Sequence, residues 1–335
     1  MKKFFIVIVI MLFVTGCYDY RELNDMSVVD GIAIDYKDDK YEVKLEVVSS
    51  EKGKDGNEIK TNVISSKDKV LANAFYKATK KSSGDIYLGH VSLLVVSENV
   101  AKRGLNDVID YVLRDIRISN DYSILVTDNI DLFKIDSKNE SISQKVNKIA
   151  NVSLGINNNV TVDMVGSMLV NDRIDLVIPY LEIDKDKTLI SKIVYFKEDK
   201  MDGIIDDKIY NFLMLDNLDI NFNKDNNVVN VYDKDIKYEV KNNMVIINID
   251  CYGTIMNLDK KYDLSKKDTY GKIENMIESV IKKDINKFMK DHKDLIGIND
   301  MYYKKYNKVK DIDSYSINVN LNINKNGAIY EVLDD

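Results

Sequence analysis

An eleven-residue apolar run, Phe4 to Val14, follows a basic start of Met1, Lys2 and Lys3 and limits where a fold can begin. A helix that spans a bilayer needs about 20 apolar residues, so this run is too short to serve as an anchor. A basic start followed by an apolar core of this length is typical of a secretory signal peptide. We therefore expect residues 1–16 to be removed and the folded part to begin after them.

The residues at the end of this run predict how the mature chain is held. Val14-Thr15-Gly16-Cys17 resembles the lipobox of bacterial lipoproteins, in which the signal is cut before the cysteine and a diacylglycerol is joined to its thiol. The alternative is ordinary secretion with a coincidental cysteine, but the start, the run and the small residue before Cys17 all favour lipidation. Each buried methylene contributes about 0.8 kcal/mol, so several acyl chains make a permanent membrane anchor.

Lipidation of Cys17 leaves the chain without a disulfide framework. Cys251 is the only other cysteine among 335 residues, so stability has to come from core packing in spite of export. Hydrophobic residues make up 45% of the chain, which is enough for an ordinary globular core. The 48 basic and 55 acidic residues give a net charge of −7, which disfavours nucleic acid as a partner.

The first half of the chain alternates between strand and helix patterns. Residues 27–36 and 40–50 predict a hairpin, and residues 59–64 a third strand. Helical spacing of apolar residues at 67–82 and 98–113 predicts two helices, which alternate with strands at 86–97 and 121–127. This order suits an α/β sheet, to which the leading hairpin adds antiparallel character.

The second half is richer in strands. We expect helices at 140–150, 161–170 and 207–215, extended segments at 173–182 and 190–196, a turn from Lys197 to Gly203, and strands separated by turns over 218–256. A long helix is predicted over 268–293, with Asp268 or Thr269 as its N-cap, and a final strand over 317–323.

These patterns predict an α+β fold of several domains, with mixed and antiparallel sheets, packed helices and one long helix in the C-terminal domain. The expected units are the signal peptide 1–16, an N-terminal α+β domain 17–185, a small middle unit 186–235, and a C-terminal domain 236–335 that holds a sheet and the long helix.

The sequence gives little support to catalysis or to metal binding. His90 and His292 are the only histidines and lie about two hundred residues apart, so no zinc-ligand spacing is present. We expect His90 to be partly buried and hydrogen-bonded, His292 to be solvated at a helix end, and Cys251 to be a buried structural thiol. The paired aspartates, such as Asp206-Asp207, fall in turns or termini, where solvated charge explains them. We therefore predict no catalytic residue, no cofactor and no metal.

The residues from Cys17 onward resemble a known family. Cys17-Tyr18-Asp19-Tyr20-Arg21-Glu22-Leu23-Asn24-Asp25, followed by Val28 to Asp35, is similar to the mature start of the Ger(x)C lipoproteins, the C subunits of nutrient germinant receptors in endospore-forming bacteria. Tyr18 stands where the family usually has Trp. Leu88-Gly89-His90, Arg114, Tyr195 to Gly203, Asp294 to Ile298 and the final strand continue the likeness. His90 and Arg114 fall on family-like positions whose role the resemblance does not give.

The resemblance implies a non-enzymatic protein of mixed α+β fold in three compact units, held on the outer face of the spore inner membrane. Its implied partners are a membrane-spanning A subunit and a transporter-like B subunit. The alternative is a lipoprotein that binds a small nutrient and presents it to a permease-like partner. A solute-binding lipoprotein usually has two similar α/β lobes, which this sequence does not show. A cell-wall hydrolase would need a catalytic constellation that the sequence does not offer. The sequence does not rank the surfaces that contact partners.

Overall fold

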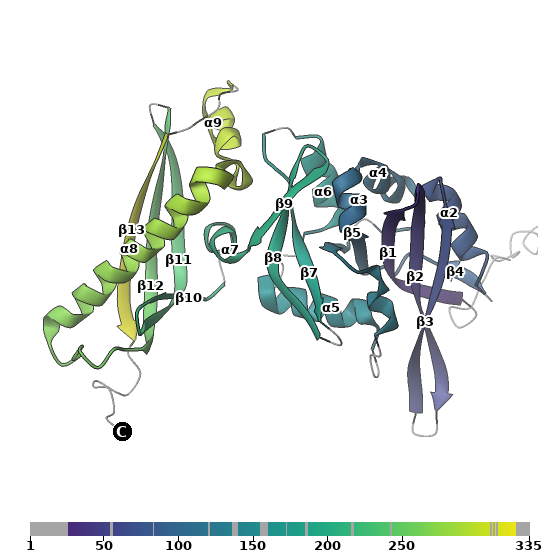
Figure 1. Ribbon diagram of the computed structural model, residues 1–335, viewed down its shortest axis with the longest axis horizontal. Helices are drawn as coiled ribbons and strands as arrows, with labels where there is room; N and C mark the ends of the chain where they lie inside the picture. The colour runs from purple at the N-terminus through teal and green to yellow at the C-terminus, as the bar shows by residue number, and fades with distance from the viewer. Residues whose placement is uncertain are drawn as a thin grey trace, which may run out of the picture.

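Two β-sheets organise the chain, one after the other along its long axis (Figure 1). The computed structural model describes residues 26–325, apart from 54–55, 83, 120, 136–139, 155–159, 172, 185–186, 216–217, 242, 309, 311 and 313. The first sheet is mixed, and the second combines an antiparallel part with one parallel strand. The predicted α+β fold class is confirmed.

The first sheet has a parallel centre with an antiparallel hairpin at each side. Its strands, in spatial order, are β3 (Gly56–Asp68), β2 (Lys40–Gly53), β1 (Met26–Lys37), β5 (Leu93–Ser97), β6 (Ser123–Thr127), β7 (Val177–Asp184), β8 (Lys187–Lys197) and β9 (Lys200–Asp206), with β4 (Asp85–Tyr87) beside β1. Strands β1, β5, β6 and β7 run parallel. The predicted hairpin is confirmed, and its turn residues Asp38 and Asp39 have φ of 53° and 58°.

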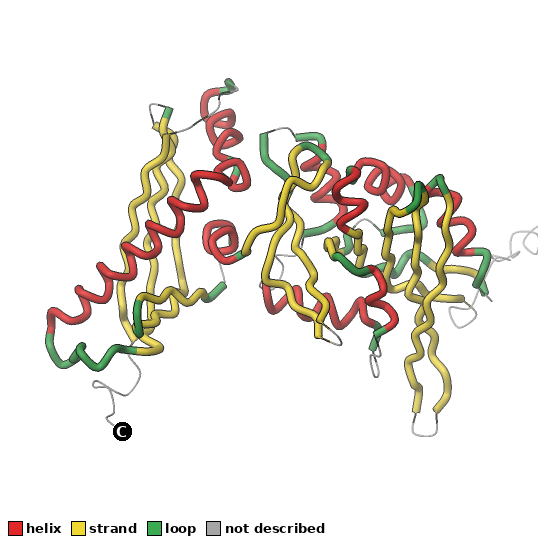
Figure 2. The backbone as a smooth tube through the Cα atoms, in the orientation of Figure 1, coloured by secondary structure: helices red, strands yellow, loops and turns green. Residues whose placement is uncertain are grey.

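Helices cover both faces of the first sheet (Figure 2). Those that pack on one face are α2 (Leu71–Thr79), α3 (Glu98–Arg103), α4 (Asn106–Arg114) and α6 (Val162–Leu169). The other face is covered by η2 (Ile130–Lys134) and α5 (Ile142–Leu154). Strands buried on both sides tolerate polar residues only where these are paired.

Two polar residues of β2 show how this pairing is made. Glu46 is fully buried and accepts hydrogen bonds from the backbone N–H groups of Ile142 (2.7 Å) and Ser143 (3.0 Å) at the start of α5. Lys44 is also buried and pairs with Asp131 of η2. Burial raises the pKa of Glu46, although these hydrogen bonds pull that pKa down. The polar row of β2 therefore fixes α5 and η2 to the sheet.

The single helix predicted over 98–113 is instead two helices, α3 and α4. Gly104 separates them with φ of +131°, a value that suits glycine. A Cβ at Gly104 would lie 2.4 Å from Asp199 Oδ2, and the Leu105 N–H donates to the Asp199 carbonyl (2.9 Å). The chain therefore breaks here because the turn between β8 and β9 packs against it.

Another expectation is corrected at this hairpin. The turn predicted from Lys197 to Gly203 is confined to Glu198 and Asp199, and β9 already begins at Lys200. Glu198 adopts φ of +57°, which closes the turn within two residues. The predicted helices near 140–150, 161–170 and 207–215 are present as α5, α6 and α7 (Lys208–Met214).

The second sheet carries the long helix. Its strands are β10 (Ile220–Lys224), β11 (Asn227–Lys241), β12 (Met244–Asn257) and β13 (Ser314–Lys325), and β13 runs parallel to β12. Helix α8 (Lys267–His292) crosses one face (Figure 1), with Ile273, Ile277 and Ile281 fully buried. After α8, η3 (Lys293–Ile296) and α9 (Ile298–Tyr306) return the chain to β13. The predicted long helix and final strand are confirmed.

The expected N-cap of α8 is wrong by two or three residues. The cap position is Lys266, and its side chain makes no capping hydrogen bond. Thr269 instead uses its hydroxyl to donate to the Asp263 carbonyl at 2.6 Å. The Thr269 hydroxyl is therefore bonded to the preceding turn, and the helix begins at Lys267, before both residues that were expected to cap it.

The two sheets share the segment between residues 186 and 235. Residues 187–206 belong to the first sheet, and residues 220–241 to the second. Between the sheets, α7 packs with its Phe212 ring 5.1 Å from that of Phe222 of β10. The division of the chain into domains at 185 and 235 stays a prediction.

Candidate functional site

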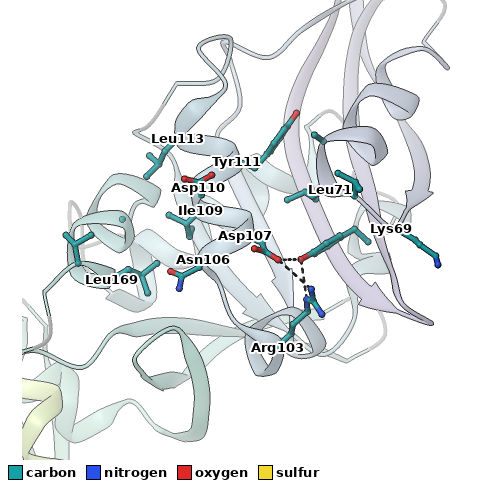
Figure 3. Close-up of a pocket in the computed structure, with 15 residues that line it drawn as sticks. Lys69, Leu71, Arg103, Asn106, Asp107, Ile109, Asp110, Tyr111, Leu113 and Leu169 are labelled. Carbon is teal, nitrogen blue, oxygen red and sulfur yellow. Dashed lines mark hydrogen bonds and ion pairs between the residues drawn. The ribbon is translucent and has the colours of Figure 1, made fainter.

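A groove on the helical face of the first sheet is the candidate site (Figure 3). It has a volume of about 710 Å³ and lies between α2, α4 and α6. Its apolar lining comes from Leu71, Ile109, Leu113 and Leu169. Gly166 also lines it, and because a Cβ there would lie 2.7 Å from Leu113 Cδ1, the glycine makes room for the Leu113 side chain. An apolar floor with a few fixed polar groups is the usual composition of a binding site.

Tyr41, Arg103 and Asp107 form the polar edge of this groove, which we call the Arg103 rim. The Arg103 guanidinium lies 4.1 Å from the centroid of the Tyr36 ring, and its Nε donates to the Tyr41 hydroxyl at 3.3 Å. The Tyr41 hydroxyl donates to Asp107 Oδ2 at 2.7 Å, and Arg103 Nη2 lies 3.6 Å from the same oxygen. Dashed lines in Figure 3 mark the contacts among Tyr41, Arg103 and Asp107.

The electrostatics of the rim favour binding over proton transfer. Burial, helped by the hydrogen bond to Asp107, raises the pKa of Tyr41, and the hydrogen bond to Tyr41 raises the pKa of Arg103. The phenol therefore stays neutral and the guanidinium charged. Because each group already bonds another, the rim presents hydrogen-bonding groups that hold one another in place.

Exposed apolar side chains flank this groove. Val70 is 54% exposed at the start of α2, and Val170 is 87% exposed after α6. Both valines belong to the lining of the groove, so the edge of the groove is partly apolar.

His90 lies in a second, more polar recess of about 560 Å³. The residues around it are Gly89, His90, Val91, Ser92, Ser119, Asp121, Tyr122, Ser123, Asn147, Asn151 and Thr161. The expectation that His90 is partly buried is wrong, because its side chain is exposed. Gly89 and His90 form an exposed turn before β5, closed by a hydrogen bond from the Val91 N–H to the Leu88 carbonyl (3.3 Å), whereas Leu88 and Val91 on either side of the turn are buried.

Arg114 lies at the end of α4 and lines a separate shallow depression. Its Nε donates to both carboxylate oxygens of Asp110 at 2.8 Å, and both side chains are largely exposed. This hydrogen bond lowers the pKa of Asp110. His90 and Arg114 therefore do not form one site, and each stays a position of unknown role.

The structure also shows the surroundings of Cys251, His292 and Asp207. Cys251 is buried as expected, and burial raises the pKa of its thiol to about 12. His292 is not simply solvated, since its ring packs 5.0 Å from Tyr195 of the first sheet. Asp207 is half-buried rather than solvated, and burial, with Asp206 beside it, raises its pKa to about 6.

The anchor residue lies beyond what the structure describes. Cys17 and the rest of residues 1–25 fall outside the described residues. Within the described part of the chain, no helix is long and apolar enough to cross a membrane. The described residues also hold no cluster of three or more His, Cys, Asp or Glu side chains that could bind a metal.

Sequence reasoning did not find the Arg103 rim. Tyr41 lies in an apolar row of β2, and Arg103 lies more than sixty residues later. The spacing of Arg103 and Asp107 is that of a helical ion pair, which was the one available signal. The break at Gly104 removes even that regularity, so only the fold brings the rim together.

Comparison with known proteins identifies the family. A model described as the spore germination protein N-terminal domain matches residues 19–183, and one described as spore germination B3/GerAC like, C-terminal, matches residues 191–329. The chain belongs to the Ger(x)C family of spore germination proteins. The resemblance seen in the sequence is thereby confirmed, and these matches cover both sheets of the Ger(x)C chain.

Individual relatives agree with this membership. The chain is 31% identical to spore germination protein KC of Bacillus subtilis (strain 168) over 146 residues, which are 40% of this chain and 36% of that protein. It is 24% identical to spore germination protein GerQC of Bacillus cereus over 130 residues, 38% of this chain and 35% of that one. These two matches therefore span about a third of each relative.

A solved structure supports the fold of this Ger(x)C protein. The crystal structure of the GerBC protein superposes with a TM-score of 0.54 and 15% identity, and covers 91% of this chain and all of that one. At this identity the similarity speaks for the fold alone. It agrees with the mixed α+β architecture and the long helix α8 described above.

Proposed function

We propose that this Ger(x)C protein is the non-enzymatic lipoprotein subunit of a spore germinant receptor. It is anchored through Cys17 on the outer face of the spore inner membrane and is needed for receptor assembly and nutrient-triggered germination. The observation that carries the proposal is the extent of the family match, which begins two residues after the lipobox cysteine and continues to residue 329. Its proposed partners are the receptor's A and B subunits.

Tethering explains how such a subunit acts without chemistry of its own. A chain held in the same membrane as its partners meets them at a high effective concentration, so a weak interface is sufficient. The groove between α2, α4 and α6 has an apolar floor and the hydrogen-bonded Arg103 rim. These properties support a contact surface that is formed before the partner arrives.

The test removes the anchor. With Cys17→Ala we expect export without acylation, weaker receptor assembly and slower germination on nutrients, because the effective concentration is lost. Germination triggered by routes that bypass the receptors should persist, and this is the control. Mass spectrometry of the membrane-extracted wild type should show an acylated Cys17. A stable, unanchored variant that germinates normally on nutrients would refute the tethering mechanism.

A second candidate, binding of a small nutrient for a permease-like partner, has one observation in its favour. In the recess beside His90, the amide oxygen of Asn147 is buried without a hydrogen-bond partner, while its nitrogen donates to the Ser92 carbonyl at 3.2 Å. A buried amide oxygen favours a ligand or water that donates to it. Calorimetric titration of the purified chain with germinants, repeated with Asn147→Leu, decides between these functions.

A further inference from the structure

The first described residues of the chain lie beside the C-terminal end of α2. Met26 pairs with Asp85 of β4, and the Ser82 hydroxyl donates to the Ser27 hydroxyl at 2.8 Å. Cys17 precedes Met26 by nine residues, a length of chain that reaches at most about 30 Å. If Cys17 is acylated, as the proposed function requires, this edge of the first sheet stays close to the bilayer.

The exposed side chains at this edge differ from the rest of the protein in charge. Residues 67–87 contain five lysines and two aspartates, whereas the whole chain carries a net charge of −7. Lys67, Lys69 and Lys77 pair with Glu42, Asp39 and Asp68, so the basic character of this edge rests mainly on Lys80 and Lys81. Tyr76 is 63% exposed, and Lys80 places its Nζ 5.5 Å from the centroid of the Tyr76 ring. Lys77 and Lys81 are exposed beside them. We call Tyr76, Lys77, Lys80 and Lys81 the α2 patch.

The α2 patch is held firmly in place. The opposite side of α2 buries Leu71, Phe75 and Ala78 in the core of the first sheet. Lys81 also donates from its Nζ to the Ser65 carbonyl of β3 at 2.6 Å. The outward face is therefore presented by a rigid helix, and Tyr76 plays no part in the core.

From this geometry we propose that the α2 patch docks on anionic lipid headgroups. Tyrosine side chains favour the membrane interface, and lysines near an anionic surface are attracted to it. Because the chain is acidic overall, a local basic edge orients it on such a surface. In the resulting orientation the second sheet, at the opposite end of the long axis, points away from the bilayer (Figure 1).

The experiment reproduces the anchor chemically. The mature chain is coupled through the Cys17 thiol to a maleimide lipid in vesicles, and Cys251 does not compete because it is 2% exposed. Acetylation of individual lysines is then followed by mass spectrometry. The vesicles contain phosphatidylcholine alone or with phosphatidylglycerol. Lys283 and Lys287, exposed on α8 of the second sheet, are the internal controls.

On anionic vesicles we expect acetylation of Lys77, Lys80 and Lys81 to slow about fivefold relative to neutral vesicles, the factor that corresponds to the surface attraction of one lysine. Lys283 and Lys287 should react equally on both. High salt should remove the difference, because it screens exposed charges. In the Lys80→Gln, Lys81→Gln variant, the protection of Lys77 should be lost, whereas Lys283→Gln, Lys287→Gln should leave it unchanged.

Equal acetylation on the two kinds of vesicle would overturn the inference. So would protection that requires other proteins of the spore membrane, because it would assign the patch to a protein partner. This result is separable from the proposed function, since chemical coupling replaces the natural anchor. A failure to find acylated Cys17 in spores would refute the proposed anchor and leave the vesicle measurement valid.

Discussion

Replacing Arg173 with alanine tests how the two sheets are held together. Arg173 lies between α6 and β7, and its Nε donates to Asp300 Oδ1 of α9 at 3.1 Å. Its guanidinium also lies 4.2 Å from the centroid of the Tyr303 ring on the same helix. The Asp300 side chain is only 5% exposed and that of Arg173 is 32% exposed. This contact joins the first sheet to the helices of the second.

The structure sets the expected size of the effect. Removing one partner of a buried ion pair costs about 3–5 kcal/mol when the other charge is left unpaired. Lys304 still lies 2.8 Å from Asp300 Oδ2, so part of that cost is avoided. Loss of the cation–π contact with Tyr303 adds about 0.5–1 kcal/mol. For Arg173→Ala we therefore expect the free energy of unfolding to fall by about 2–3 kcal/mol.

Urea unfolding measures this loss, and Arg114→Ala is the matched control. Arg114 also pairs with an aspartate, Asp110, but both side chains are largely exposed, so its removal should change stability by less than about 0.5 kcal/mol. If Arg173→Ala destabilises the protein no more than Arg114→Ala does, burial of the contact contributes nothing and the reasoning fails.

The pH dependence of the same variant gives a second check. Burial alone would raise the pKa of Asp300, but hydrogen bonds from Lys304 and Arg173 outweigh it and lower that pKa. A carboxylate with a lowered native pKa stabilises the fold above its unfolded pKa of about 4 and loses this contribution as pH falls. The stability difference between wild type and Arg173→Ala should therefore shrink below about pH 4. A difference that stays constant through acid would contradict the assignment.

Two further predictions concern packing. A Cβ at Gly31 would lie 2.0 Å from Ser143 Oγ, so Gly31→Ala should give insoluble or strongly destabilised protein. A Cβ at Gly271 in α8 would have nothing within 4 Å, so Gly271→Ala should raise the free energy of unfolding by about 0.5–1 kcal/mol. Expression level and urea unfolding measure both variants, and equal effects would contradict this contrast. Phe288→Ala should cost about 3–5 kcal/mol, because Phe288 is 7% exposed and lies on α8 in the core of the second sheet. A loss below about 1 kcal/mol would show that the ring contributes little to the core.

Periodicity in the sequence was sufficient for most elements. Alternation in residues 27–50 predicted the first hairpin, and helical spacing predicted α8 almost to its ends. Alternation also predicted the final strand, and the structure buries its alternate residues Val319, Leu321 and Ile323. These elements follow from local patterns because each buries one face, and the period of its apolar residues reports that face directly.

The Ger(x)C motifs were equally local. The residues from Cys17 to Asp35 and those around His90 and Tyr195 to Gly203 identified the family, which the two family models confirm. Recognition of this kind depends on the order of residues along the chain. It needs no knowledge of which elements meet in space.

The tertiary structure alone decided which residues come together. Lys44 and Glu46 lie in the polar row of β2, yet they are buried, because η2 and α5 cover the second face of the sheet. Arg103 meets Tyr41 from more than sixty residues away, and Arg173 meets Asp300 across 127 residues. Periodicity shows which face of an element is apolar, whereas these contacts depend on where the chain returns. That return is fixed by strand pairing and by the packing of whole helices, so no local pattern contains it.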